Sequence, residues 1–119
     1  MAAKEERRFG ETVRQLRQAK NLGLREFAKQ VGISPTYLSK IERDEFNPPA
    51  EEKVRAIAKA LGQDEDEMLA LAGKVSSDLP EIIRSRPREM AMFLRTVTHL
   101  TDEEIRTIIE RARKRKRSF

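Results

Sequence analysis

The chain has 119 residues and a net charge of +5, with 25 Lys and Arg against 20 Asp and Glu. It contains no Cys and no Trp, which excludes disulfides and thiolate metal sites and requires a core of mainly aliphatic side chains. No apolar run is long enough to span a membrane, and the N-terminus is charged where a signal peptide would be apolar. These features predict a cytoplasmic, all-α protein that needs no cofactor.

Helical periodicity and cap residues predict five helices before Gly73 and about three short ones after it. The first five are expected over about 4–20, 24–31, 35–43, 50–61 and 65–72. Asp44–Pro49 is expected to be a loop, because Asn47-Pro48-Pro49 cannot continue a helix. The chain is thereby divided into an N-terminal domain, residues 1–73, and a C-terminal helical module, residues 74–119.

The two short helices of the first domain have the spacing of a helix-turn-helix. Phe27 and Val31 lie four residues apart on one face of the first helix, and Leu38 and Ile41 lie three apart on one face of the second. Ala28 falls where the two helices come closest, so a larger side chain would separate them. This geometry lays the second helix into the major groove of DNA.

The turn between these helices has matching residues. Gly32 lacks a Cβ and can take a positive φ at low cost. Ser34 then offers a hydroxyl as N-cap, and Pro35 suits the first helical position. An ordinary helical hairpin is the alternative, but it does not require all of these residues at fixed spacing.

On these residues the chain resembles the Cro/C1-repressor type of helix-turn-helix regulators, also called Xre-like, over about Phe9–Ala72. The most specific segments are F-G-x-x-V-R-x-L-R, A-K-Q-V-G-I-S and Y-L-S-K-I-E, followed by Asn47-Pro48-Pro49. The resemblance implies a five-helix, lambda-repressor-like bundle that binds operator DNA as a dimer. One departure is that Gly23 and Leu24 replace the polar Ser-Gln pair that often begins the first motif helix.

The resemblance also implies particular roles in base readout. It places Pro35, Thr36 and Lys40 at base-reading positions, with Tyr37 beside them. Thr36 can hydrogen-bond a base or contact a thymine methyl, and Lys40 can donate to guanine. Pro35 has no polar group, so direct readout by this helix is expected to be limited and supplemented by DNA shape. Phosphate contacts by Lys40 or by the Tyr37 hydroxyl are the alternatives.

Phosphate contacts are expected to position the helix and to supply most of the affinity. The candidates are the backbone at Leu24, the side chains of Arg25 and Ser39, Arg43 at the end of the second motif helix, and Asn47 in the following loop. A different role is implied for Arg17 and Glu42, which the resemblance pairs in a buried ion bridge between the first helix and the recognition helix.

The C-terminal module carries three short amphipathic helices and a basic tail, residues 111–119. Its first helix starts at Asp78, its second near Pro87, and its third with the capping box Thr101-x-x-Glu104. Such short stripes are not easily buried alone, so they are expected to pair with a second subunit, with packing on the bundle as the alternative. Residues 1–73 have equal numbers of acidic and basic residues, so the net positive charge comes from residues 74–119. Contact with DNA phosphates is expected for the tail, against a solvated end or an acidic protein surface.

No catalytic or metal-binding set is visible. The single His99 is expected simply to end a helix. The leading hypothesis is therefore a dimeric, sequence-specific DNA-binding repressor associated with the nucleoid, which is not an enzyme. The alternative is an antitoxin that binds its own operator while its C-terminal helices neutralise a toxin. A separate regulatory protein is a further possible partner, and a nonspecific nucleic-acid binder that relies on the tail is a third hypothesis.

Overall fold

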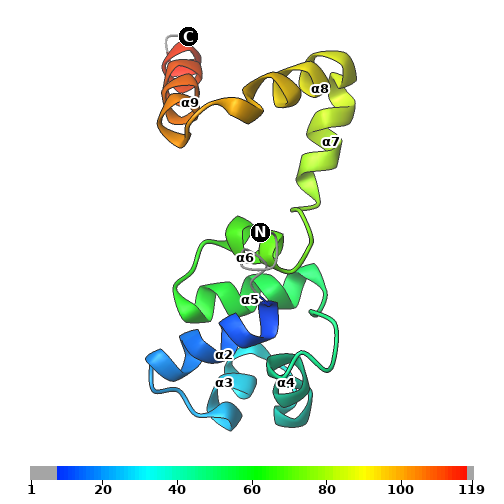
Figure 1. Ribbon diagram of the computed structural model, residues 1–119, viewed down its shortest axis with the longest axis vertical. Coiled ribbons are helices and arrows are strands. Elements are labelled where there is room, and N and C mark those ends of the chain that lie inside the picture. The colour runs from blue at the N-terminus through cyan, green and yellow to red at the C-terminus, as the bar shows by residue number, and fades with distance from the viewer. Residues whose placement is uncertain (1–7, 118–119) are drawn as a thin grey trace. The chain divides into compact units, whose positions relative to one another are not determined.

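The computed structural model describes residues 8–117 of the chain. Over these residues it contains eight α-helices, one short 3₁₀ helix and no β-strand, which confirms the predicted all-α class (Figure 1). The chain divides after Ser76 into two compact units, and each is described by itself. The expected start of the first helix at Lys4 and the last two residues of the basic tail lie outside the described residues.

The first unit holds five of the described helices. They are α2 (Phe9–Ala19), α3 (Leu24–Val31), α4 (Pro35–Glu42), α5 (Glu51–Leu61) and α6 (Glu65–Leu71). Arg43 and Ala50, predicted to be helical, are instead cap residues. Helix α4 stops before Arg43 because the backbone turns into the left-handed region at Asp44, with φ of 58°. Ala50 has the extended backbone of an N-cap.

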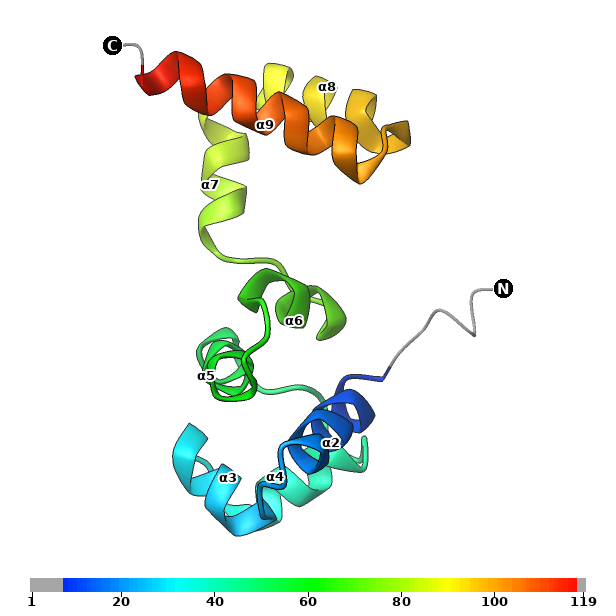
Figure 2. The ribbon, with the colours of Figure 1, turned by 90° about the vertical axis from the view of Figure 1, so that its left-hand side faces the viewer.

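Apolar side chains from all five helices form one core. Ala28 is fully buried at the contact between α3 and α4, as its small size requires. Figures 1 and 2 show α3 and α4 at one end of the unit, away from α6. The largest fully buried side chains are Phe27, Leu38, Ile41, Ile57, Leu61, Leu69, Val13 and Val54. This shared core fixes the angle at which α4 is presented.

Helices α2 and α4 make a close backbone contact at Gly10. The Gly10 amide donates a hydrogen bond to Asp44 Oδ1 at 3.0 Å. A Cβ on Gly10 would lie 1.9 Å from the carbonyl oxygen of Ile41 and 2.7 Å from Asp44 Oδ1. Only glycine therefore allows α2 to approach the end of α4 this closely.

Arg55 joins three segments at the end of the first unit. Its guanidinium donates to Glu65 Oε1 at 2.7 Å, to Glu51 Oε2 at 2.9 Å and to Ser76 Oγ at 2.5 Å. The hydrogen bonds with Glu65 and Glu51 raise the pKa of Arg55. Ser76 is itself buried, so this cluster fastens the end of the unit to α5 and α6.

The second unit consists of α7 (Asp78–Ser85), α8 (Pro87–Thr96), the 3₁₀ helix η1 (Val97–His99) and α9 (Asp102–Arg117). The predicted capping box is confirmed, because Glu104 N donates to Thr101 Oγ1 at 3.1 Å and Thr101 N donates to Glu104 Oε1 at 2.9 Å. The basic segment through Arg117 is helical and continues α9 without a break. None of the described helices is long and apolar enough to cross a membrane.

Side chains of the second unit remain largely accessible. Between residues 77 and 116, where side chains are described, none is buried. The exposed large apolar side chains of this unit are Leu79, Ile82, Met92, Phe93, Leu94 and Ile109. Within its described residues this unit therefore has no buried core, and it exposes apolar surface to solvent.

Candidate nucleic-acid interface

The turn between α3 and α4 fixes how α4 begins. Gly32 ends α3 in the left-handed conformation, with φ of 76°, and Ile33 N donates to Ala28 O at 3.0 Å. The Ser34 hydroxyl accepts a hydrogen bond from Tyr37 N at 3.0 Å, and Pro35 occupies the first helical position. These local predictions are confirmed. They explain why α4 starts sharply after the turn.

A buried ion bridge holds α4 against α2. Arg17 Nε and Nη2 donate to the two carboxylate oxygens of Glu42 at 2.7 and 2.9 Å, and Nη1 donates to Leu22 O at 2.7 Å. The hydrogen bond with Glu42 raises the pKa of Arg17, against the opposing effect of burial. The bridge satisfies both charges and leaves the opposite, solvent-facing side of α4 available for other contacts.

Six of the residues expected to contact DNA surround one open hollow. It has a volume of about 270 Å³ and lies between the start of α3 and the outer face of α4. Thr36, Arg25 and Arg43 are exposed at its rim, whereas Leu24 also packs against the core. The lining residues are Leu24, Arg25, Pro35, Thr36, Ser39 and Arg43. Asn47 is exposed in the loop that follows α4.

Lys40 and Tyr37 belong to a neighbouring cluster at the other edge of α4. Lys40 Nζ lies 3.8 Å from Glu45 Oε1 and 5.6 Å from the centre of the Phe46 ring. The Tyr37 and Phe46 rings are tilted against each other, with their centres 6.0 Å apart. Arg43 Nε lies 3.6 Å from Glu45 Oε2. The Glu45 carboxylate thus lies between Lys40 of α4 and Arg43, the residue that caps this helix.

The sequence analysis did not identify Glu45 and Phe46. Their position depends on the left-handed residue Asp44, after which Glu45 N donates back to Lys40 O at 2.9 Å. The only signal in the sequence was an aromatic residue within a polar loop, and Phe46 is 48% exposed. The Phe46 ring contacts the Tyr37 ring and lies near the Lys40 ammonium, so it orders both side chains along one edge of α4.

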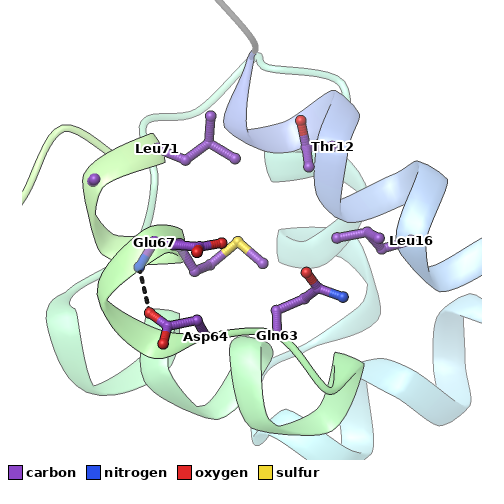
Figure 3. Close-up of a pocket in the computed structure, with 8 residues that line it drawn as sticks. Thr12, Leu16, Gln63, Asp64, Glu67 and Leu71 are labelled. Atoms are coloured by element: carbon purple, nitrogen blue, oxygen red, sulfur yellow. Dashed lines mark hydrogen bonds between the residues drawn. The ribbon is translucent and has the colours of Figure 1, made fainter. Parts of the chain in front are cut away.

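A second hollow, shown in Figure 3, lies between α2 and α6 and has a volume of about 320 Å³. Leu16, Met68 and Leu71 supply its apolar lining, and the carboxylates of Asp64 and Glu67 stand at its rim. None of the expected DNA-contacting residues belongs to it. The two carboxylates would repel phosphate, so this hollow does not form part of a DNA interface.

Two short helices around a left-handed glycine, with a polar outer face on the second, define a DNA-binding helix-turn-helix domain built on a five-helix bundle. Residues 8–71 match the family model described as "Helix-turn-helix domain". The chain belongs to this family. The match agrees with the resemblance to Cro/C1-type regulators and with a non-catalytic domain.

Known proteins show the same similarity. The chain is 33% identical over 76 residues to the "Uncharacterized HTH-type transcriptional regulator RghRB" of Bacillus subtilis (strain 168), covering 64% of this chain and 54% of that relative. It thus spans about half the length of this curated relative. The solution structure of the DNA-binding domain of the P22 C2 repressor is 31% identical, with a TM-score of 0.50, over 60% of this chain and 90% of that domain.

A third comparison concerns the fold alone. A chain of the SinR/SinI protein complex is 22% identical, with a TM-score of 0.50, and the match covers 91% of this chain and 97% of that one.

Proposed function

We propose that this protein is a sequence-specific DNA-binding transcription regulator that acts as a dimeric repressor on nucleoid DNA in the cytoplasm. The observation that most supports this proposal is the open hollow between α3 and α4. Six residues suited to contact a DNA groove and its phosphates line it. The similarity to the P22 C2 repressor DNA-binding domain supports this proposal. Residues 1–73 are proposed to bind DNA and residues 74–119 to join two copies.

The proposed base contacts come from α4, inserted in the major groove. In this proposal Thr36 in the first turn and Lys40 one turn later contact base edges, while Pro35 shapes the contact and Tyr37 lies beside them. Phosphates on either side are met by the amide of Leu24, by Arg25, Ser39 and Arg43, and by Asn47. Gly23 provides no side-chain cap to α3, which leaves its first amides suited to a phosphate.

Selection of bound DNA from a random double-stranded pool tests the proposal. The full chain should enrich inverted half-sites centred about one helical turn apart, because a two-fold dimer presents two copies of α4. Recovery without any sequence preference would contradict it and would support binding by the basic segment of α9 instead.

Lys40→Ala and Arg25→Ala are expected to weaken DNA binding in different ways, the first depending on DNA sequence and the second not. Loss of Lys40 should weaken binding to the selected operator by about 1–3 kcal/mol, or roughly 5- to 150-fold, and relax preference at one base pair. Loss of Arg25 should weaken binding to all sequences alike and lower the salt slope by about 1. Titrations of operator and scrambled DNA at several salt concentrations measure both. An equal loss on both DNAs for Lys40→Ala would reassign it to a phosphate.

Glu45→Gln is expected to strengthen DNA binding by about two- to fivefold on operator and scrambled DNA alike. The carboxylate neutralises Lys40 and Arg43 in the free protein and would face phosphates in a complex. Its exposed ion pairs contribute little to folding, so the melting temperature should hardly change. Glu52→Gln on α5 removes an exposed charge elsewhere and serves as control. Weaker binding by Glu45→Gln would show that Glu45 supports the contact.

An antitoxin is the second candidate, favoured by the exposed apolar side chains of α7 and α8. In that case these helices would cover a toxin or another regulatory protein rather than a second copy. Light scattering of the purified chain separates the two candidates. A dimer supports the repressor, whereas a monomer that forms a stoichiometric complex with the product of an adjacent toxin gene supports the antitoxin.

A further inference from the structure

We propose that two copies of this chain pair through α9 in antiparallel orientation, each helix covering the apolar stripe of the other. This inference rests on the proposed dimer and specifies its contact surface and direction. The occupant of the stripe is thus a second copy of the same helix, and the argument rests on apolar spacing and on charge.

The apolar stripe of α9 is formed by Ile105, Ile108, Ile109 and Ala112, at i, i+3, i+4 and i+7. Figure 2 shows α9 as one uninterrupted helix. None of the four side chains is buried, and Ile109 is 43% exposed. Removing an isoleucine side chain from water is favourable, so a matching apolar surface would stabilise this stripe.

The charges of α9 are separated along its length. Its first turn holds Asp102, Glu103 and Glu104, whereas Arg111–Arg117 contributes six basic residues and no acidic one. At 100° per residue, Asp102 and Arg113 flank one side of the apolar stripe, and Glu104 and Arg115 flank the other. Each flank therefore has an acidic end and a basic end.

An antiparallel pair brings these unlike ends together. A two-fold axis between Ile108 and Ile109 places each flank against the same flank of the second helix, running in reverse. Asp102 then lies within about 3 Å, measured along the axis, of the partner's Arg113, and Glu104 lies equally near the partner's Arg115. Symmetry doubles both pairs.

A parallel pair would oppose like charges instead, acid to acid in the first turn and base to base in the last turns. The antiparallel pair also sets the basic C-terminal turns beside the acidic N-terminal turn of the second helix. The basic segment is then engaged with protein. Contact of the same segment with DNA is the competing outcome.

Charge reversal in the full chain tests the direction of pairing. Asp102→Lys and Arg113→Glu should each raise the dimer dissociation constant on the order of tenfold, because each opposes like charges twice. An equimolar mixture of the two variants should restore dimerisation to within about twofold of the unchanged chain. Sedimentation at low salt measures the association, and circular dichroism verifies that helix content is kept.

Glu103→Lys and Lys114→Glu are the matched controls. They make the same charge changes at neighbouring positions, but both residues project from the side of α9 opposite the stripe. They should leave the dissociation constant within about twofold. The proposed antiparallel pairing of α9 is wrong if the controls weaken the dimer as much as the test variants. It is also wrong if the mixture of test variants does not recover dimerisation.

A dimer whose dissociation constant does not respond to any of the four substitutions would also contradict the antiparallel pairing of α9. The proposed regulator function would be unaffected, since the DNA selection tests that function separately. If dimerisation is unchanged while Arg113→Glu and Lys114→Glu lower DNA affinity equally, the basic turns contact DNA. The antiparallel pairing of α9 is then rejected.

Discussion

Glu42→Ala is expected to lower the free energy of unfolding by about 3–5 kcal/mol and to lower the melting temperature by at least about 10 °C. The substitution removes two of the three hydrogen bonds that the structure gives the Arg17 guanidinium and leaves it, in a largely buried position, with the bond to the Leu22 carbonyl. A loss of this size is a large part of the total free energy of unfolding of a small domain. Thermal and urea unfolding of the purified variant measure the loss.

Arg17→Ala should destabilise the bundle similarly, since it strands the Glu42 carboxylate. Arg14→Ala on the same helix is the matched control, because Arg14 is exposed and its loss should change stability by no more than about 0.5 kcal/mol. DNA binding by the Glu42 variant, measured where it is still folded, should be close to that of the unchanged chain. A Glu42→Ala protein with an unaltered melting temperature would show that the bridge is not needed for folding.

Gly10→Ala is expected to destabilise the bundle by about 3 kcal/mol, at the upper end of what overpacking costs. The added Cβ would meet the Ile41 carbonyl oxygen at 1.9 Å, so α2 or the end of α4 must move. That movement would also break the hydrogen bond from Gly10 N to Asp44 Oδ1. Because Asp44 positions the following loop, DNA affinity should fall together with stability. Unfolding curves and operator titrations on one preparation measure both effects.

Gly23→Ala is the corresponding control. No atom lies within 4 Å of a Cβ built on Gly23, and its φ of −70° suits any residue. Its stability should change by less than about 1 kcal/mol, which reflects only the poorer capping of alanine. Equal stability of the two variants would mean that α2 shifts away from α4 without strain.

Much of the fold could be predicted because its signals are local. The Ser34 cap, the left-handed Gly32 and the Thr101-x-x-Glu104 capping box involve residues within one helical turn of each other. The apolar spacing of Phe27 with Val31, and of Leu38 with Ile41, identified the buried faces correctly. The helix-turn-helix was recognisable for this reason.

The residues beside the expected DNA contacts were less accessible to sequence reasoning. Glu45 and Phe46 reach Lys40 only because Asp44 turns the backbone, and no local pattern shows where that turn points. The basic segment was expected as a tail, and its described part is helical. The roles of the individual DNA-facing residues stay predictions that the titrations above address.

By itself the sequence determined the all-α class, the helix-turn-helix and the faces of its helices, since caps and periodicity act over three to eight neighbouring residues. Only the tertiary structure decided how closely α2 approaches α4 at Gly10, and which cations Glu45 neutralises. The approach of Gly10 to Asp44 joins residues 34 positions apart in the chain. The distance between Gly10 and Asp44 depends on how the whole core packs, and this packing involves many side chains together.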